Sequence, residues 1–279
     1  MKKINRRSFL AAAGLTAAAL ALTACGGSAS STASSTASSA ASSEAASTSA
    51  AAELTTVEAG KLTMATNATF PPYEMTTDAG TIEGIDVDTA QAIAEKLGLE
   101  LQIDDMDFDA ALLSVQQGKA DIAMAGITVT DERMAVMSFS DSYATGIQSI
   151  IVPNDSDIAS PDDLAGKKIG TQRGTTGYLY CSDDFGEDAV VAYDNGLTAV
   201  QALNNGQVDA VVIDNEPAKA YVESNPGLKI LDTSYAEEDY AIGMNKSNTA
   251  LLEAVNAALE ELKADGTLQS IVDKYIKAE

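Results

Sequence analysis

Residues 105–143 read DMDFDAALLSVQQGKADIAMAGITVTDERMAVMSFSDSY, and this stretch decides the fold class. Apolar residues at helical spacing run from Phe108 to Gln117 and stop at Gly118, a residue suited to closing a helix. The apolar run 120–125 then predicts a buried strand. Thr130, followed by two acidic residues, predicts the N-cap of the next helix. The stretch therefore predicts a helix, a buried strand and a second helix in succession.

The same alternation continues on both sides of this stretch. Further strands are predicted at 61–65, 99–103, 147–152, 168–171, 189–193, 209–213, 228–231 and 240–244. Further helices are predicted at 86–97, from 160 over one short turn, and at 176–182, 196–204, 216–223, 248–263 and 268–277. Strands that alternate with helices predict an α/β fold with mainly parallel sheets and helices on both faces.

A weak internal repeat indicates two related halves. Residues 116–122, QQGKADI, match residues 204–210, NNGQVDA, and each consists of a helix end, a closing Gly and the start of a buried strand. In sheets of this kind ligands bind beyond the carboxyl ends of the strands. Two such halves facing each other would form a cleft between those ends.

The first 24 residues predict an export signal. Four basic residues precede the apolar stretch from Phe9 to Ala24, which is short for a membrane-spanning helix and suits a signal peptide. The stretch ends in Leu22-Thr23-Ala24-Cys25, which resembles a lipobox and implies cleavage before Cys25 and lipid attachment to its sulfur. The alternative is an uncleaved anchor. Arg6-Arg7 also resembles a twin-arginine export motif, so two export routes stay open.

Residues 25–56 predict a disordered tether behind the lipidated Cys. This region is rich in Ser, Thr and Ala and has too little bulky apolar surface to offset the entropy of ordering its backbone. An anchor and a tether predict a folded part held at the cell membrane on its extracellular face, or in the periplasm where the cell has an outer membrane.

The composition excludes several classes of function. The chain of 279 residues has no His and two Cys, which excludes a Ser-His-Asp triad, a His-ligated zinc site and a thiolate metal cage. Without the first 24 residues, 13 basic side chains remain against 41 acidic ones, and so acidic a surface repels nucleic acid. We expect no metal, no cofactor and no nucleic-acid partner. Cys181 is expected to be a buried structural thiol.

Arg133 is the sharpest candidate for ligand binding. Beyond residue 24 the chain contains two arginines, Arg133 and Arg173, among eleven lysines. A guanidinium group is a planar fork that binds a carboxylate through two hydrogen bonds, so an Arg in this background indicates such a task. The alternative is a surface Arg that pairs with an acid of its own first turn, Asp131.

Asp214 is the second candidate. It follows the apolar run 210–213, at the carboxyl end of a predicted strand, where side chains of such sheets face the ligand. Its partner there would be an ammonium group, and the alternative is an N-cap for the helix at 216–223. An Arg for a carboxylate and an Asp for an ammonium, from opposite halves, are the minimal set for a free α-amino acid.

Other motifs are weaker on their own. The loop 173–177, RGTTG, presents backbone N–H groups suited to an anion but lacks the spacing of a P-loop. Phe70, held by the prolines after it, and Phe108 predict either an aromatic sandwich around a ligand or core residues. The acids at 86–88 and 104–109 lack the spacing of an EF-hand, and we interpret them as helix caps and solvated acids.

Six segments, in this order and spacing, resemble family 3 extracellular solute-binding proteins, the amino-acid receptors of ABC importers. They are ATNATFPPYEM, EGIDVDTAQAIAEKLG, DMDFDAALLSVQQGKADIAMAGITVTDERMAVMSFSDSY, SPDDLAGKKIGTQRGTTG, ALNNGQVDAVVIDNE and ALEELKADGTLQSIVDKYI. The resemblance covers about residues 62–276. It implies the type II periplasmic-binding-protein fold, in which two lobes with mainly parallel sheets are joined by two hinge strands. Lobe 1 would comprise residues 57–148 and 241–279, and lobe 2 residues 149–240.

The family pattern also implies a set of ligand-binding residues. Arg133 would bind the α-carboxylate of the ligand, aided by Thr128 and the backbone of Thr176. Asp214 would bind the α-ammonium together with the Gly126 carbonyl and the Thr128 hydroxyl. The other implied positions flank the ligand side chain or complete the wall of the site: Asn67, Phe70, Phe108, Ala125, Gln172 and Thr175.

One departure from the family pattern bears on the ligand. Many members carry Asp where this chain has Asn67, and Asn supplies no counter-ion for a cationic side chain. The substitution predicts a polar neutral amino acid, such as glutamine, asparagine, serine or cystine. Arg173 nearby would instead favour an acidic ligand.

The resemblance implies a lipid-anchored, monomeric receptor without catalytic residues. It would bind a free L-amino acid between its lobes, close around it and deliver it to the permease of an ABC importer. Two alternatives remain at this stage. One is an enzyme of the same fold, similar to cyclohexadienyl dehydratases, which would need a placed general acid. The other is a ligand-sensing module.

Overall fold

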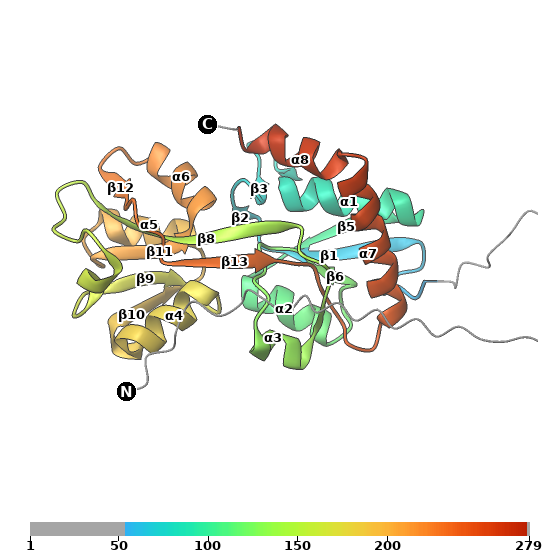
Figure 1. The fold of residues 1–279 in the computed structure, drawn as a ribbon, viewed down its shortest axis with the longest axis horizontal. Coiled ribbons are helices and arrows are strands. Elements are labelled where there is room, and N and C mark those ends of the chain that lie inside the picture. The colour runs from blue at the N-terminus through green and yellow to red at the C-terminus, as the bar shows by residue number, and fades with distance from the viewer. Residues whose placement is uncertain (1–53, 278–279) are drawn as a thin grey trace, which may run out of the picture. The chain divides into compact units, whose positions relative to one another are not determined.

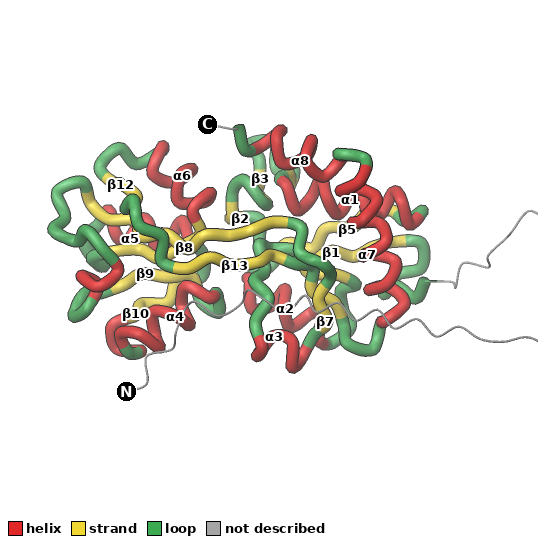
Figure 2. Tube along the Cα trace, viewed as in Figure 1, coloured by secondary structure: helices red, strands yellow, loops and turns green. Residues whose placement is uncertain are grey.

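The computed structural model describes residues 54–277, in which strands and helices alternate (Figure 1, Figure 2). The predicted signal peptide, Cys25 and all of the predicted tether up to residue 53 lie outside this range. Among the described residues, no helix combines the length and the apolar character that crossing a membrane requires.

The first sheet has five strands in the order β5-β1-β6-β14-β7. Its strands are β1 (Lys61–Thr66), β5 (Glu100–Asp105), β6 (Ile122–Ala123), β7 (Ser138–Phe139) and β14 (Gly243–Met244). β1 runs parallel to β5 and β6, and β14 runs antiparallel to β6 and β7. The helices around it are α1 (Ile85–Leu97), α2 (Phe108–Gln116), α3 (Asp131–Val136), α7 (Thr249–Ala264) and α8 (Thr267–Tyr275).

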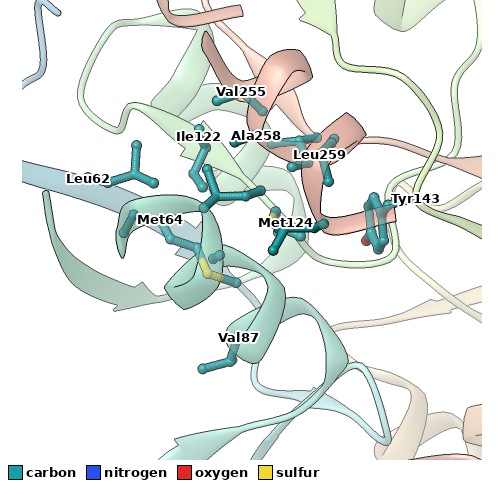
Figure 3. Packing of buried hydrophobic residues seen from close by; sticks show 14 of the residues in the cluster. Leu62, Met64, Val87, Ile122, Met124, Tyr143, Val255, Ala258 and Leu259 are labelled. Carbon is teal, nitrogen blue, oxygen red and sulfur yellow. The ribbon is translucent and has the colours of Figure 1, made fainter. Parts of the chain in front are cut away.

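Helices cover both faces of the first sheet because its central strands are apolar on both. Leu62 and Met64 of β1 belong to one hydrophobic cluster with α1, α7 and α8, which Figure 3 shows from close by. Ala65, the next residue along β1, belongs to a second cluster with α2. Neighbouring residues of a strand point to opposite faces, so one short strand supplies both layers.

The second sheet has six strands in the order β10-β9-β11-β8-β12, with β13 also paired to β8. Its strands are β8 (Ala144–Pro153), β9 (Ile169–Gln172), β10 (Val190–Tyr193), β11 (Ala210–Asp214), β12 (Leu228–Ile230) and β13 (Ala236–Tyr240). The parallel strands are β10, β9 and β11, while β8 runs antiparallel to its three partners. The helices are α4 (Thr176–Phe185), α5 (Gly196–Asn204) and α6 (Asn215–Glu223), with 3₁₀ turns η1 (Pro161–Leu164) and η2 (Glu187–Ala189).

β8 and β13 lie side by side and extend from the second sheet toward the first (Figure 1). Their pairing ends at Ala144 and Tyr240. Tyr240 also forms a β-bridge with Thr128, which follows β6 of the first sheet. The prediction of one strand over 240–244 is wrong, because β13 ends at Tyr240 and β14 begins separately at Gly243. The lobe boundaries at 148/149 and 240/241 stay predictions.

A third sheet, which the sequence did not predict, lies beside the first half. Its strands β2 (Thr69–Phe70), β3 (Glu74–Thr76) and β4 (Ile82–Glu83) are antiparallel and two or three residues long. Strands this short give no periodic signal. The buried strand predicted over 120–125 is also shorter than expected, since only Ile122 and Ala123 pair in a ladder.

Candidate functional site

A narrow, partly open pocket with a free volume of about 20 Å³ lies where the carboxyl ends of β1, β6, β9 and β11 meet. Its wall includes all eleven residues that the family pattern implied. The lining is Asn67, Phe70, Glu74, Phe108, Ala125, Gly126, Thr128, Arg133, Gln148, Gln172, Thr175, Thr176, Val212, Ile213, Asp214 and Tyr240. Residues from both halves of the chain thus line one pocket, as ligand sites at strand ends in α/β sheets do.

Arg133 lies on α3 and is buried, with 7% of its surface exposed. Its Nη1 donates to the Thr128 carbonyl oxygen at 2.8 Å, and its Nη2 donates to the Gly174 carbonyl oxygen at 3.1 Å. The guanidinium carbon lies 5.3 Å from the centroid of the Phe108 ring. These contacts fix the plane of the guanidinium at the pocket wall.

No carboxylate pairs with Arg133 within 4.0 Å among the described residues, so the alternative of a surface pair with Asp131 does not hold. Burial lowers the pKa of the Arg133 guanidinium, and the charge of Glu238 opposes that effect. A buried cation without a close anion is a site where an anionic ligand gains binding energy.

Asp214 ends β11 on the opposite wall and is 1% exposed. Its Oδ1 accepts from the Glu216 N–H at 3.0 Å, so the N-cap interpretation is confirmed. Its Oδ2 accepts from the Tyr240 hydroxyl at 2.8 Å and the Ile147 N–H at 2.9 Å. Burial raises the pKa of the Asp214 carboxyl to about 6 despite these donors. The Asp214 carboxyl group therefore caps α6 and lines the pocket at the same time.

Thr128 and Gly126 come from the loop between β6 and α3. The Thr128 hydroxyl donates to Glu238 Oε2 at 3.0 Å and lies 3.4 Å from the Thr176 hydroxyl, so one lone pair remains for a ligand donor. Gly126 has φ +54°, and a Cβ there would lie 2.7 Å from the Phe70 ring. The position therefore requires Gly, both for its backbone conformation and for the approach of Phe70.

Direct hydrogen bonds join the two halves around the pocket. Gln172 Nε2 donates to Asn67 Oδ1 at 2.9 Å, and the Tyr221 hydroxyl donates to the Thr69 carbonyl oxygen at 2.6 Å. The Arg133 contact to Gly174 crosses in the same way. Asn67 also donates to the Met106 carbonyl at 2.8 Å, so its amide is fixed by contacts on two sides.

The remaining predicted residues, Thr175, Phe70 and Phe108, cap a helix or pack against neighbouring side chains. Thr175 caps α4 by accepting from the Tyr178 N–H at 3.4 Å, so the N-terminus of that helix points toward the pocket. Phe70 stacks on Tyr73 with centroids 5.7 Å apart. Phe108 is buried in the cluster around α2 and also lines the pocket, so the core and wall interpretations both hold for it.

Two expectations for charged residues are corrected. Arg173 is exposed, pairs with Asp194 at 3.5 Å and does not line the pocket, so it favours no acidic ligand there. Asp86 is not a solvated acid: it is fully buried and its Oδ2 accepts from the Gly126 N–H at 3.0 Å. In the described range no cluster of His, Cys, Asp and Glu could hold a metal ion. Cys181 is buried in the core of the second sheet.

Sequence reasoning missed several polar residues of the site. Glu74 and Tyr240 lie on the unpredicted or misplaced strands β3 and β13. Gln148 interrupts the apolar run 147–152, and a polar residue in a buried strand was a usable signal. Glu238, which accepts from Thr128 and from Gln148 at 3.0 Å, was hidden in the acidic run 237–239.

Two sheets flanked by helices, a pair of strands that runs between them and a pocket at the strand ends define the type II periplasmic-binding-protein fold. Residues 62–278 match the sequence profile of the bacterial extracellular solute-binding proteins, family 3. The chain belongs to this family and is a solute-binding receptor rather than an enzyme.

Known proteins that are similar to this chain are named for different amino acids. It is 31% identical to a probable histidine-binding protein of Neisseria gonorrhoeae, over 99% of this chain and 98% of the relative. It is 32% identical to the L-cystine-binding protein TcyJ of Escherichia coli K12, over 80% and 85%. A solved structure of an ancestral arginine-binding protein bound to arginine is 43% identical, with a TM-score of 0.75 and coverage of 78% and 98%.

Proposed function

We propose that this protein is the receptor of an ABC importer and binds one free L-amino acid in the pocket described above. The observation that carries the proposal is that two buried side chains of opposite charge line one pocket: Arg133, which has no carboxylate within 4.0 Å among the described residues, and Asp214. A ligand that carries both a carboxylate and an ammonium, as a free α-amino acid does, would satisfy both residues. Relatives are named for histidine, L-cystine and arginine, and these three ligands all carry an α-carboxylate and an α-ammonium but differ in side chain.

Each α-group of the ligand meets a prepared surface in this proposal. The carboxylate binds the guanidinium of Arg133, and the N-terminus of α4 at Thr176 lies beside it. The ammonium donates hydrogen bonds to the Asp214 carboxylate, the Gly126 carbonyl oxygen and the Thr128 hydroxyl oxygen. Phe70 and Phe108 flank the ligand side chain, while Asn67, Ala125, Gln172 and Thr175 complete the wall.

The mechanism is closure of two lobes around the ligand. The two halves already touch through Gln172–Asn67 and Arg133–Gly174, which lie at the pocket. A ligand that bridges Arg133 and Asp214 adds contacts only when the halves are close, so it shifts the equilibrium toward the closed form. We assign lobe 1 to residues 57–148 and 241–279 and lobe 2 to residues 149–240, with β8 and β13 as hinge strands.

A thermal-unfolding screen against the proteinogenic amino acids and cystine tests the proposal. A ligand that binds the folded state alone raises the midpoint as its concentration rises, by mass action. We expect a rise with at least one L-amino acid and none with its D-enantiomer. A flat response to every amino acid tested would remove the proposed function.

We also propose that the mature chain is anchored by lipid on Cys25 and tethered by residues 25–56. The support is the order of four basic residues, an apolar stretch and Leu22-Thr23-Ala24-Cys25. Mass spectrometry of the protein made in a bacterial host should find Cys25 as the N-terminal residue, carrying a diacylglyceryl group. An N-terminus elsewhere, or an unmodified Cys25, would overturn the anchor without affecting the proposal for the pocket.

A further inference from the structure

Glu238 is a buried acid of β13 that does not line the pocket but holds two residues that do. It is 6% exposed, although its neighbours Glu237 and Asp239 are exposed. Its Oε2 accepts from the Thr128 hydroxyl and from Gln148 Nε2, each at 3.0 Å. Thr128 and Gln148 are buried and both line the pocket. Glu238 is therefore one hydrogen bond away from the ligand site.

Segments from both halves of the chain meet around this carboxyl group. Thr128 comes from the loop between β6 and α3, and Gln148 comes from β8. Tyr180 of α4 lies near it as well, since burial and then the charge of Glu238 raise the pKa of the Tyr180 hydroxyl. Gln148 continues toward α4, because a Cβ on Gly177 would lie 2.9 Å from its Oε1. The contacts of Glu238 thus extend from the Thr128 loop to the first turn of α4.

The carboxylate fixes the direction of the hydrogen bonds that its neighbours make. A carboxylate oxygen accepts hydrogen bonds and donates none, so the Thr128 hydroxyl must point its proton at Glu238. The Thr176 hydroxyl lies 3.4 Å away and can use one lone pair of the Thr128 oxygen. The other lone pair then faces a ligand as an acceptor. An ammonium group only donates, so it matches this arrangement, whereas a carboxylate does not.

The charge of Glu238 also reaches Arg133, and that effect has a different signature. Among the described residues no ion pair within 4.0 Å joins Arg133 to an acid, although the charge of Glu238 opposes the lowering of its pKa by burial. An acid that acted only on Arg133 would compete with the ligand carboxylate, so its removal would tighten binding of every carboxylate. An acid that acts through Thr128 has the opposite effect, and only on ligands with an ammonium group.

Building on the proposed function, we infer that Glu238 is a positioning residue for the α-ammonium of the ligand, because it orients the Thr128 hydroxyl as an acceptor from outside the pocket. Asp214 supplies the charge that the ammonium needs, and Glu238 sets the direction of one of its hydrogen bonds. Glu238 lies on β13 and its second donor, Gln148, lies on β8. The orientation is therefore set by the two strands that run between the sheets.

A double-mutant cycle by calorimetry on the full chain tests the inference, with Glu238→Met and Thr128→Val. The probes are the twenty proteinogenic L-amino acids and L-cystine. The tightest binder among them is compared with the acid that has hydrogen in place of its α-amino group. Each substitution should weaken the amino acid by about 10-fold or more and change the deamino acid by no more than a few-fold. The double variant should bind no more weakly than Thr128→Val, because Glu238 acts through that hydroxyl.

Glu238→Gln is the rescue variant, because its amide oxygen can still accept from Thr128 and Gln148. It should recover most of the affinity that Glu238→Met loses. Glu237→Met is the matched control, since Glu237 is the exposed neighbour on the same strand, and it should leave both probes unchanged. A Glu238→Gln protein as weak as Glu238→Met would assign the effect to charge and overturn the inference.

Other outcomes are equally decisive. Losses that add in the double variant, equal losses for the amino acid and its deamino acid, or tighter binding of both after Glu238→Met would overturn the inference. If Glu238→Met does not fold, Thr128→Val still decides, because equal losses for its two probes would exclude an acceptor for the ammonium. Each of these results leaves the proposed function in place, whereas no binding of any amino acid to the unmodified protein would remove that function too.

Discussion

Burying a guanidinium without a carboxylate in contact costs free energy, and among the described residues Arg133 has no carboxylate within 4.0 Å. The protein offsets part of this cost with two backbone carbonyls and the face of Phe108. These contacts use one N–H of each terminal nitrogen and fix the orientation of the fork. The rest of the fork is therefore ready for a carboxylate before the ligand arrives.

Arg133→Lys should weaken amino-acid binding by about one to two decades although the charge is kept. A lysine ammonium is a point charge that cannot make the two parallel bonds, and one charge-assisted bond contributes about 1.5–3 kcal/mol. Calorimetry with the best ligand measures the loss. Arg173→Lys is the matched control, because Arg173 is exposed and lies outside the pocket. Similar effects of the two substitutions would argue against Arg133 as the carboxylate site.

Rare residues were predictable from sequence and common ones were not. Arg133 stood out because the chain beyond residue 24 has one other Arg, and Asp214 stood out because it ends an apolar run. Glu74 and Glu238 are two acids among 41, and only their burial distinguishes them. Burial of a polar side chain depends on what folds over it, which is information from distant parts of the chain.

At the scale of elements, the longer helices were predictable and the short strands were not. The helix predicted at 196–204 matches α5 residue for residue, since its apolar spacing and closing Gly206 are local signals. β13 was missed because its sequence, AEEDY, contains three consecutive acids, which do not predict a strand. Glu237 and Asp239 are exposed, whereas Glu238 is buried beside β8. Its strand character comes from β8, so the element is specified by its partner rather than by its own propensity.

Gly146 shows how closely β8 and β13 are packed. A Cβ at this position would lie 2.4 Å from Cζ of Tyr240, the residue whose hydroxyl donates to Asp214. Gly146→Ala should therefore displace Tyr240, lower the free energy of unfolding by about 1–3 kcal/mol and weaken ligand binding as well. Urea unfolding and calorimetry measure the two effects.

Gly227→Ala is the control for this substitution, because no atom lies within 4 Å of a Cβ there and its backbone is not left-handed. It should change the free energy of unfolding by less than about 1 kcal/mol. If Gly146→Ala were as mild as the control, the Tyr240 contact would not support the site.

At the scale of the whole described chain, the fold places one half of the proposed amino-acid site beside each sheet. Arg133 belongs to the first half and Asp214 to the second, and β8 and β13 run between the sheets. In the proposed mechanism each half binds one end of the ligand, so binding and closure are coupled. The alternation of strands and helices predicted this arrangement, because it sets where the strand ends lie.

The measurement that decides whether Asp214 holds the α-ammonium is a double-mutant cycle by calorimetry. It uses the best amino acid and its deamino analogue on the unmodified protein and on Asp214→Asn. Asp209→Asn, at the opposite end of the β11 region and exposed, is the control. Removing the amino group should cost the unmodified protein about 3–5 kcal/mol, since a buried carboxylate loses its partner. In Asp214→Asn the same removal should cost little more, which gives a large coupling energy. If the two losses simply add, Asp214 only caps α6 and the proposed amino-acid site is wrong.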